Sequence, residues 1–304
     1  MSTLFFTVIT LIAFAANSVL CRWALADNSI DPLSFSLIRI VSGAITLILI
    51  YWAVNRSKQR TAGGQPLQSK EMKQSNWKGN PTSIGALLVY MFGFSYAYVA
   101  LGAGLGALIL FVMVQLTMVV VHLIQARGMS LLEWFGCAIA ISGLVILLWP
   151  DNQQHALDFK AALLMMLAGI GWGCYTLAGR KVNDPLQATM INFSYAGLAS
   201  LVLLIVVIFS GAMSDALFMN NSGVTYALLS GVFASAMGYT LWYQVVKKLS
   251  TLTASVAQLS VPIIATLGGV LFLSEPITLQ FVIASGIIFV GIAAVILSPK
   301  VSNS

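Results

Sequence analysis

The stretch QLSVPIIATLGGVLFLSEPIT, from Gln258 to Thr278, poses the main question about the fold. It is apolar enough to lie in a membrane, yet Pro262 sits inside the apolar run and Glu275 closes it. A proline removes one backbone hydrogen bond, and in a membrane the freed carbonyl must find a partner in the protein or in a water-filled cavity. The stretch therefore predicts a helix that kinks at Pro262 toward a bundle interior. Packing that merely accommodates the proline is the alternative, and Glu275 is predicted to end the helix near the outer surface.

The composition of the whole chain is that of an integral membrane protein. Of its 304 residues, 59% are hydrophobic and only 8% are charged, whereas soluble domains are about 25% charged. So few charges cannot cover a water-facing surface, and we expect the lipid bilayer to surround the protein. The excess of 15 Lys and Arg over 9 Asp and Glu does not call for a nucleic acid partner, because basic residues collect in cytoplasmic loops.

Ten stretches qualify, or nearly qualify, as membrane spans, each of which needs roughly 20 mostly apolar residues. Asn80-Pro81 and Asp184-Pro185 are among the turn signals between them. We therefore predict an all-α integral membrane protein with ten transmembrane helices and a polar, basic linker at residues 55–82, which we expect to be mobile. The predicted helices are Leu4–Ala24, Ser34–Val54, Ser83–Leu101, Leu105–Ala126, Leu131–Leu148, Phe159–Ala178, Gln187–Ser210, Val224–Val246, Thr251–Leu273 and Thr278–Leu297.

The distribution of basic residues predicts the orientation in the membrane. With the N-terminus placed in the cytoplasm, 12 of the 15 Lys and Arg residues fall in inside loops or in the C-terminal segment. Acidic residues such as Asp31 and Asp151 then fall outside. Basic residues favour the cytoplasmic side, so both termini are predicted to be cytoplasmic.

The two halves of the chain, residues 1–150 and 151–304, repeat one pattern. DPLSFSLIRIVSGAITLIL (residues 31–49) parallels DPLQATMINFSYAGLASLVL (184–203), and SLLEWFGCAIAISGLVIL (130–147) parallels TLQFVIASGIIFVGIAAVIL (278–297). Each half holds five predicted helices, and five is odd, so the second half must enter the membrane inverted. Inverted repeats around a site at the midplane are typical of secondary transporters.

The second half resembles the EamA domain of the drug/metabolite transporter superfamily. The resemblance is carried by LLMMLAGIGWGCYTLAGRKV (163–182), GVFASAMGYTLWYQVVKKLSTLTASVAQLSVPIIATLGGVLFLSEPIT (231–278) and GIIFVGIAAVIL (286–297). The first half matches more weakly, with Val114 and Arg127 at its equivalents of Pro262 and Glu275. The resemblance implies two inverted five-helix EamA repeats in a secondary transporter of the bacterial inner membrane. It further implies that the substrate is a small organic metabolite, often moved outward.

Aromatic and polar side chains inside the apolar helices are the candidate lining of a substrate cavity. Tyr90, Phe94 and Tyr98 recur at four-residue steps and so share one helix face. Amides and hydroxyls are costly against lipid and should face the bundle interior. Core packing, or for Tyr and Trp a place at the membrane interface, is the alternative for each. The candidates are Asn17, Arg39, Tyr90, Phe94, Tyr98, Gln115, Trp172, Tyr175, Tyr239, Trp242, Tyr243 and Gln258.

Arg22 and Arg39 fall within predicted helices near the outer surface. Arg39 lies about six residues into its predicted helix, roughly 9 Å from the outer end at 1.5 Å per residue. The two arginines are predicted to attract anionic or carboxylate groups to an outer mouth. Snorkelling of their side chains to lipid headgroups is the alternative.

The sequence lacks the motifs of an enzyme, a metal site or an ATP-driven pump. It contains no GxxxxGK[ST] stretch, and its cysteines at 21, 137 and 174 have no CxxC spacing. Its two histidines cannot form a His-based metal cluster, so no metal or cofactor is predicted. No Asp or Glu falls near a helix centre, which leaves His122 as the candidate proton site. Packing of a hydrogen-bonded histidine is its alternative role.

Three functions remain open on the sequence. The first is a secondary transporter that exports amino acids or related metabolites by alternating access, with proton coupling as one option. The second is an importer or exchanger of another metabolite class. The third is a membrane scaffold or an intramembrane enzyme. The inverted repeat favours transport, and the lack of a carboxylate pair or a Cys/His nucleophile disfavours an enzyme.

Overall fold

The structure, a computed structural model, describes residues 3–61, 79–126, 130–149, 158–210, 217–249, 254 and 257–297. Its described residues form helices and contain no β-strand, only an isolated bridge between Ile30 and Met219. The helices are α1 (Thr3–Ala26), α2 (Pro32–Thr61), α4 (Pro81–Ala97), α5 (Ala103–Ala126), α6 (Leu131–Leu148), α7 (Phe159–Gly179), α8 (Pro185–Phe209), α9 (Asn221–Leu229), the π-helix η1 (Ser230–Met237), α10 (Gly238–Val246), α12 (Ser260–Leu273) and α13 (Leu279–Leu297).

α9, η1 and α10 run on without a break from Asn221 to Val246 and form one continuous helical segment. The twelve elements in the described part of the chain therefore make ten continuous helical segments, which we call rods. Each rod coincides with one of the ten predicted spans, so the predicted all-α membrane fold is confirmed. Seven of the rods are long and apolar enough by themselves to cross a membrane. The other three rods, α4, α12 and α13, are also apolar, but their apolar helical stretches are shorter than 18 residues.

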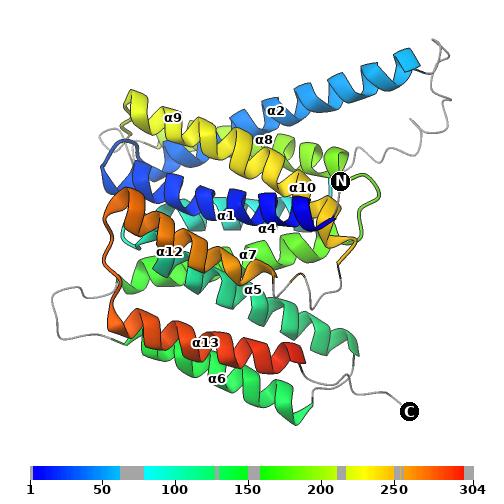
Figure 1. Cartoon of the computed structure of the whole chain (residues 1–304). Coiled ribbons are helices and arrows are strands. Elements are labelled where there is room, and N and C mark those ends of the chain that lie inside the picture. Colours follow the sequence, from blue (N-terminus) through cyan, green and yellow to red (C-terminus); the bar gives the residue numbers. More distant parts are fainter. Residues whose placement is uncertain are drawn as a thin grey trace.

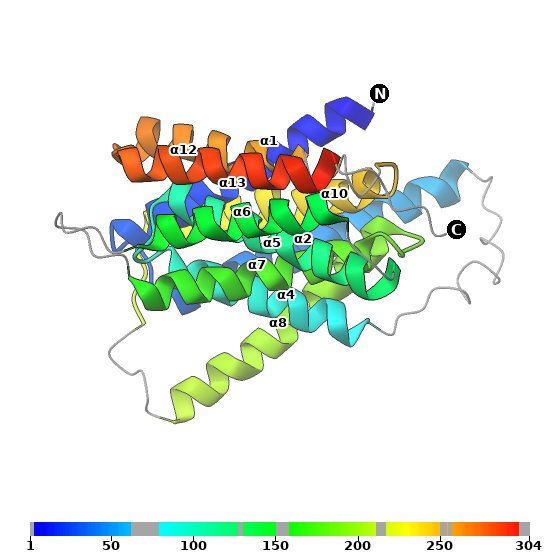
Figure 2. The same ribbon diagram turned by 90° about the horizontal axis from the view of Figure 1, so that it is seen from below.

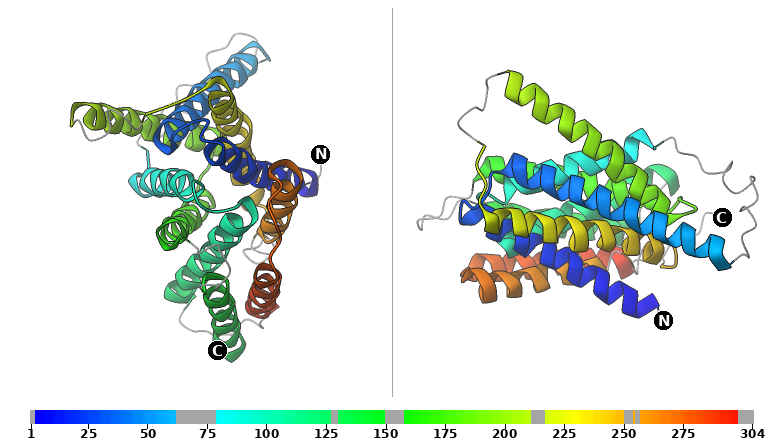
Figure 3. Two further views of the ribbon diagram at one scale, coloured as in Figure 1. Left: turned by 90° about the vertical axis from the view of Figure 1, so that its left-hand side faces the viewer. Right: turned by 90° about the horizontal axis from the view of Figure 1, so that it is seen from above.

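The rods lie roughly side by side, with loops gathered at the two ends of the bundle (Figures 1 and 2). Viewed end-on in the left panel of Figure 3, α6 and α13 form an arm that extends away from the other helices. The start of α1 and the end of α13 lie at the same end of the bundle (Figure 1). An even number of antiparallel spans has this consequence, and it keeps both ends of the described chain on one side.

The packing of the rods follows a two-fold pattern. α4 packs on α7 as the Asn221–Val246 rod packs on α1, and α5 packs on α7 as α12 packs on α1. α2 meets α8, α5 meets α12, and α6 meets α13. We match the first five rods in order with the last five. The contacts of α7 with α4 and α5 then correspond to the contacts of α1 with the Asn221–Val246 rod and α12, and the other three contacts each join a rod to its own match.

Glycines allow the closest of these approaches. A Cβ on Gly171 of α7 would lie 2.7 Å from the carbonyl oxygen of Ala86 in α4. A Cβ on Gly231 of η1 would lie 2.5 Å from the carbonyl oxygen of Arg39 in α2. Small residues at such positions let membrane helices pack backbone to backbone, which here draws α2, α4, α7 and η1 toward one central region.

The predicted linker at 55–82 begins too early. α2 continues to Thr61, seven residues beyond the predicted end at Val54, and projects from the bundle (Figure 1). Arg56 lies over the ring of Trp52, 4.9 Å from its centroid, and a contact at four-residue spacing supports a helix. Pro81 and Thr82 belong to α4, whose first turn is capped by the side chain of Asn80 accepting from Thr82 N at 3.0 Å. Residues 62–78 lie outside the described part of the chain.

The predicted span Thr251–Leu273 is not one continuous helix. Ala257 and Gln258 are helical, the pattern is interrupted at Leu259, and α12 starts at Ser260. Pro262 therefore lies in the first turn of α12, where its missing N–H has the least effect. The Gln258 carbonyl is the group that an ordinary residue at 262 would bond, so the interruption falls next to the missing hydrogen bond.

Candidate functional site

Arg39 lies in the interior of the bundle and not at its surface. The sequence predicted that its side chain would reach an outer mouth or snorkel to lipid headgroups. It does neither, because the side chain is fully buried. Arg39 Nε donates to Ser235 Oγ at 2.8 Å, and Nη2 donates to the hydroxyls of Tyr90 at 3.1 Å and Tyr239 at 2.6 Å. The position of Arg39 along its helix predicted a place near one end of that helix. The sequence of α2 alone does not show that this face of the helix turns toward α4 and η1.

The Tyr90 hydroxyl is the hub of this polar network. It accepts from Asn17 Nδ2 at 3.2 Å, from Arg39 Nη2, and lies 2.9 Å from the Tyr239 hydroxyl. Asn17 in turn accepts from the Ser230 hydroxyl at 2.6 Å. α1, α2, α4, η1 and α10 are thus joined by side-chain hydrogen bonds in a region that is closed to solvent.

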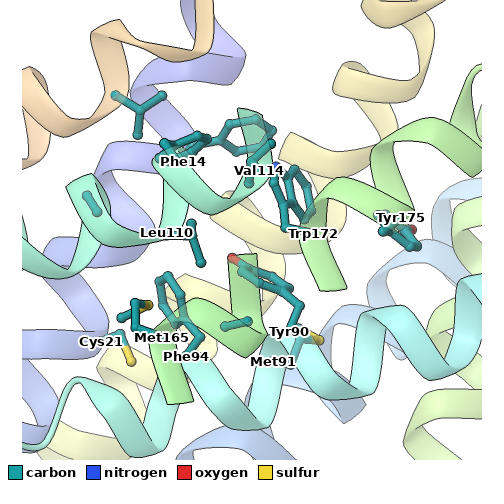
Figure 4. Close-up of a cluster of buried hydrophobic side chains, with 14 of the residues drawn as sticks. Phe14, Cys21, Tyr90, Met91, Phe94, Leu110, Val114, Met165, Trp172 and Tyr175 are labelled. Carbon is teal, nitrogen blue, oxygen red and sulfur yellow. The ribbon is translucent and has the colours of Figure 1, made fainter. Parts of the chain in front are cut away.

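Aromatic rings pack around the network, with Trp172 of α7 at their centre. Its ring centroid lies 5.1 Å from that of Phe14, 5.0 Å from Tyr90, 4.7 Å from Tyr239 and 5.7 Å from Tyr175. Figure 4 shows Phe14, Trp172 and Tyr90 gathered where α1, α4 and α7 approach one another. Broad apolar walls with a few polar groups are what small-molecule sites usually have.

Three further residue pairs connect this aromatic centre to its neighbours. Trp172 Nε1 donates to Gln258 Oε1 at 3.2 Å, just before the interruption at Leu259. Tyr243 stacks on Tyr175 with centroids 4.8 Å apart and donates to the Tyr175 carbonyl at 2.9 Å. Trp242 packs edge-on against Phe14 at 5.6 Å. The site thereby reaches the helical turn that precedes α12.

Most of the predicted site residues meet in this one network. Phe94 joins it through Tyr90 at 5.3 Å, and Tyr98 follows through Phe94 at 4.6 Å. The Tyr98 hydroxyl, however, donates to the Ala103 carbonyl at 3.2 Å, so its hydrogen bond lies at the start of α5 and not in the central network. Gln115 is buried in α5. His122 belongs to α5, but its side chain lies outside the described part of the structure.

Sequence reasoning missed three residues of the site: Phe14, Ser230 and Ser235. Phe14 is one apolar residue in an apolar helix, so nothing distinguishes it by pattern. Ser230 and Ser235 lie in the segment SGVFASAM, whose small residues are typical of close helix packing. The spacing of these serines on a π-helix, with its wider turn, directs both toward the network.

A second polar cluster closes the end of the bundle where α1 ends. Arg22 Nε lies 3.1 Å from Glu275 Oε1, and Arg22 Nη1 donates to the carbonyls of Tyr98 at 3.0 Å and Val99 at 2.8 Å. Glu275 Oε2 accepts from Ala103 N at 2.7 Å. Glu275 was predicted to end its own helix, and it also caps the first turn of α5. We call Arg22, Glu275 and Ala103 the end latch.

Among the described residues, no group of three or more His, Cys, Asp or Glu side chains is placed to hold a metal ion. One carboxylate is buried in this part of the chain, that of Asp31. It accepts from Ser34 N at 2.9 Å and Phe218 N at 3.1 Å at the start of α2. The chemistry of the central network is therefore that of binding through cationic, hydroxyl, amide and aromatic groups.

Comparison with known proteins agrees with this architecture. Residues 159–297 match the EamA-like transporter family. An uncharacterized protein of Pseudomonas aeruginosa is 39% identical over 303 residues, which cover 99% of this chain and 96% of that protein. The uncharacterized transporter YoaV of Bacillus subtilis is 21% identical over 268 residues, or 87% of each chain. A solved structure titled "Crystal structure of protein" has a TM-score of 0.59 over 98% of both chains at 18% identity, which shows a likeness of fold alone. The chain belongs to the EamA-like transporter family.

Proposed function

We propose that the protein is a secondary transporter that exports amino acids or related small metabolites across the bacterial inner membrane by alternating access. The observation that carries this proposal is the buried network of Asn17, Arg39, Tyr90, Trp172 and Tyr239. A scaffold needs no such concentration of polar groups, which are costly to bury in a membrane protein. Membership of a transporter family supports the same conclusion and argues against an enzyme.

Alternating access requires a site that both halves of the chain share. α1, α2 and α4 supply Asn17, Arg39 and Tyr90, whereas α7 and α10 supply Trp172 and Tyr239. The two-fold packing of the rods supports two inverted repeats, residues 1–150 and 151–304, as the moving units. A relative rotation of these units would open the network first to one side and then to the other.

The proposed orientation places both termini in the cytoplasm and the end latch outside. The 12 basic residues assigned to the inside support this orientation. In the described structure the latch holds the α1–α12 end together. Opening of this proposed outer end would therefore require Arg22 and Glu275 to separate.

Exchange of one metabolite for another is the second candidate function. Its basis is the lack, among the described residues, of a buried carboxylate other than Asp31, which is fully engaged at the start of α2. Proton-coupled carriers often use a membrane-buried acid as the proton carrier. His122 remains the candidate proton site, and the His122→Gln variant keeps a polar side chain while removing titration near neutral pH.

The decisive experiment is export from proteoliposomes loaded with a panel of amino acids and organic acids, with and without a pH gradient. Trp172→Ala and Gln258→Ala should each lower the initial rate by about tenfold, corresponding to roughly 1.4 kcal/mol, because both remove contacts at the centre. Trp134→Ala is the matched control, since Trp134 is exposed on α6. A pH effect on the unmodified protein would indicate proton coupling. Its loss in His122→Gln would identify His122 as the proton carrier, and its persistence would exclude His122. Wild-type rates in both central variants at equal expression would contradict the proposed site.

A further inference from the structure

The positive charge of Arg39 is not neutralised by any described residue of the protein. Arg39 is fully buried, and it donates hydrogen bonds to the hydroxyls of Ser235, Tyr90 and Tyr239. No Asp or Glu oxygen lies within 4.0 Å of its guanidinium among the described residues, where the ion pair is that of Arg22 with Glu275. Charges buried in proteins are normally paired, so a guanidinium with no anion among the described residues is suited to pair with a bound anion.

The hydrogen-bonding inventory around Arg39 leads to the same conclusion. A guanidinium has five N–H donors and no acceptor. Nε and Nη2 have partners, but Nη1 is buried without one. The Tyr90 hydroxyl already receives donors from Asn17 and Arg39. The network thus holds more donors than acceptors, which is the composition of an anion site.

Aromatic rings around the guanidinium define what else would be bound. Arg39 Cζ lies 4.9 Å from the ring centroid of Phe94 and 5.3 Å from that of Tyr90, so these rings cover part of the cation. Trp172 lies beyond Tyr90, with 5.0 Å between their centroids. An anionic group at Nη1 would therefore have apolar surface beside it, suited to an organic acid with a hydrocarbon body.

We propose that Arg39 binds the carboxylate of the transported molecule through Nη1, with the apolar body of that molecule against Trp172 and Tyr239. This assignment rests on the proposed transport function and specifies the class of its substrate: a monocarboxylate with an apolar body, amino acid or simple acid alike. Arg39 and the surrounding rings are fully or almost fully buried. The ligand therefore enters only when the rings separate, as the alternating-access movement requires.

Binding of matched probes to the purified full-length protein tests the charge requirement. The probes are 3-phenylpropionate, butyrate and phenylalanine, each compared with its neutral or cationic analogue: 3-phenylpropionamide, butyramide and phenylalaninamide. Thermal unfolding and tryptophan fluorescence report binding. We expect at least one carboxylate to bind about tenfold or more tightly than its amide, as a charge-assisted hydrogen bond provides. Equal binding of every carboxylate and its amide would overturn the proposal. Binding of chloride or phosphate with the same affinity would do so as well, since it would make the site a general anion site.

Variants then separate ligand binding from a structural role of the arginine. Arg39→Gln should lose about tenfold or more of the carboxylate affinity, while the ligand-free protein keeps or raises its midpoint of thermal unfolding, because an unpaired buried charge is removed. Arg39→Lys keeps the charge and should retain part of the affinity. Arg56→Gln, on the exposed part of the same helix, is the control. A lower unfolding midpoint in Arg39→Gln with unchanged carboxylate affinity would assign Arg39 a structural role instead.

Failure of this assignment differs from failure of the transport proposal. If proteoliposomes export neutral metabolites and Arg39→Gln exports them equally well, transport stands and the carboxylate site is wrong. If carboxylates bind in an Arg39-dependent way but no compound crosses the membrane, the site stands and the transport function is wrong.

Discussion

Arg22 and Glu275 are 253 positions apart in the chain, yet Arg22 Nε lies 3.1 Å from Glu275 Oε1. The pair joins the C-terminal half of α1 to the residues that follow α12. Its surroundings depend on a small residue, because a Cβ at Gly269 would lie 2.5 Å from Glu275 Oε2. Both side chains are 19% exposed, so water screens the pair only in part. An ion pair that spans the two halves at one end is suited to hold that end closed.

Breaking the end latch should increase access from that end of the bundle. Glu275→Gln removes the charge that pairs with Arg22 and weakens the cap on Ala103 N. A half-buried pair of this kind contributes about 1 kcal/mol, so the open fraction should rise roughly fivefold. The measurement is labelling of buried Cys21, next to Arg22, with an impermeant thiol reagent in a Cys137→Ser, Cys174→Ser background.

The control for the latch is Glu133→Gln, which alters a carboxylate that caps its own helix α6 and contacts Ser130 N at 2.7 Å. It should leave Cys21 labelling unchanged. Equal labelling of Cys21 in the Glu275→Gln and parent proteins would show that the latch does not limit access.

Removing the Tyr90 hydroxyl should destabilise the protein. Tyr90→Phe leaves the amide of Asn17 and one N–H of Arg39 without an acceptor, and a buried unsatisfied donor costs about 1–3 kcal/mol. We expect a lower midpoint of thermal unfolding in detergent. Tyr195→Phe is the comparison, because Tyr195 is exposed on α8. Similar midpoints for the two variants would mean that the Tyr90 hydroxyl contributes little to the network.

Replacing Pro262 should separate stability from transport. Pro262→Ala supplies the N–H that can bond the Gln258 carbonyl, which would extend α12 toward Ala257. The unfolding midpoint should stay the same or rise, whereas the transport rate should fall, because the interruption at Leu259 next to the site would be lost. Transport and binding of a carboxylate probe are measured on the same preparation. A variant that transports at the wild-type rate would show that the proline is only accommodated by packing.

Membrane topology can be tested at two exposed positions near opposite ends of the bundle. Lys248 follows α10 and Asn28 follows α1. In intact cells, an impermeant thiol reagent should label Asn28→Cys and leave Lys248→Cys unlabelled until the membrane is opened. Labelling of Lys248→Cys from the outside would reverse the proposed orientation and place the end latch on the cytoplasmic side.

The number of rods and several site faces could be predicted because they depend on local patterns. Apolar length gave the ten spans, and four-residue spacing placed Tyr90 and Phe94 together, as their 5.3 Å centroid distance confirms. Burial cost directed Asn17 and Gln258 inward, where both are found. These properties need only one helix and the knowledge that its surroundings are apolar.

The remaining features depend on contacts between distant segments. The burial of Arg39 requires the rotation of α2 relative to α4 and η1, and no pattern within α2 specifies it. The cap that Glu275 places on Ala103 joins residues 172 positions apart. The extension of α2 beyond Val54 was missed because a polar, basic composition predicted a linker, although Lys, Gln and Arg are good helix formers.

The π-helix η1 has a consequence for comparing the two halves of the chain by sequence. Each π turn bonds residues five apart, so a rod that contains one holds an additional residue for the same rise. The parallel between residues 130–147 and 278–297 has an offset of 148 positions, and the same offset pairs Phe94 with Trp242, which follows this segment. Residues before Ser230 should then correspond to α4 at an offset smaller by one. An ungapped alignment of the two halves would therefore pair non-equivalent residues on one side of η1. It would also hide the one-residue insertion in η1, the segment in which Ser230 contacts Asn17 and Ser235 contacts Arg39.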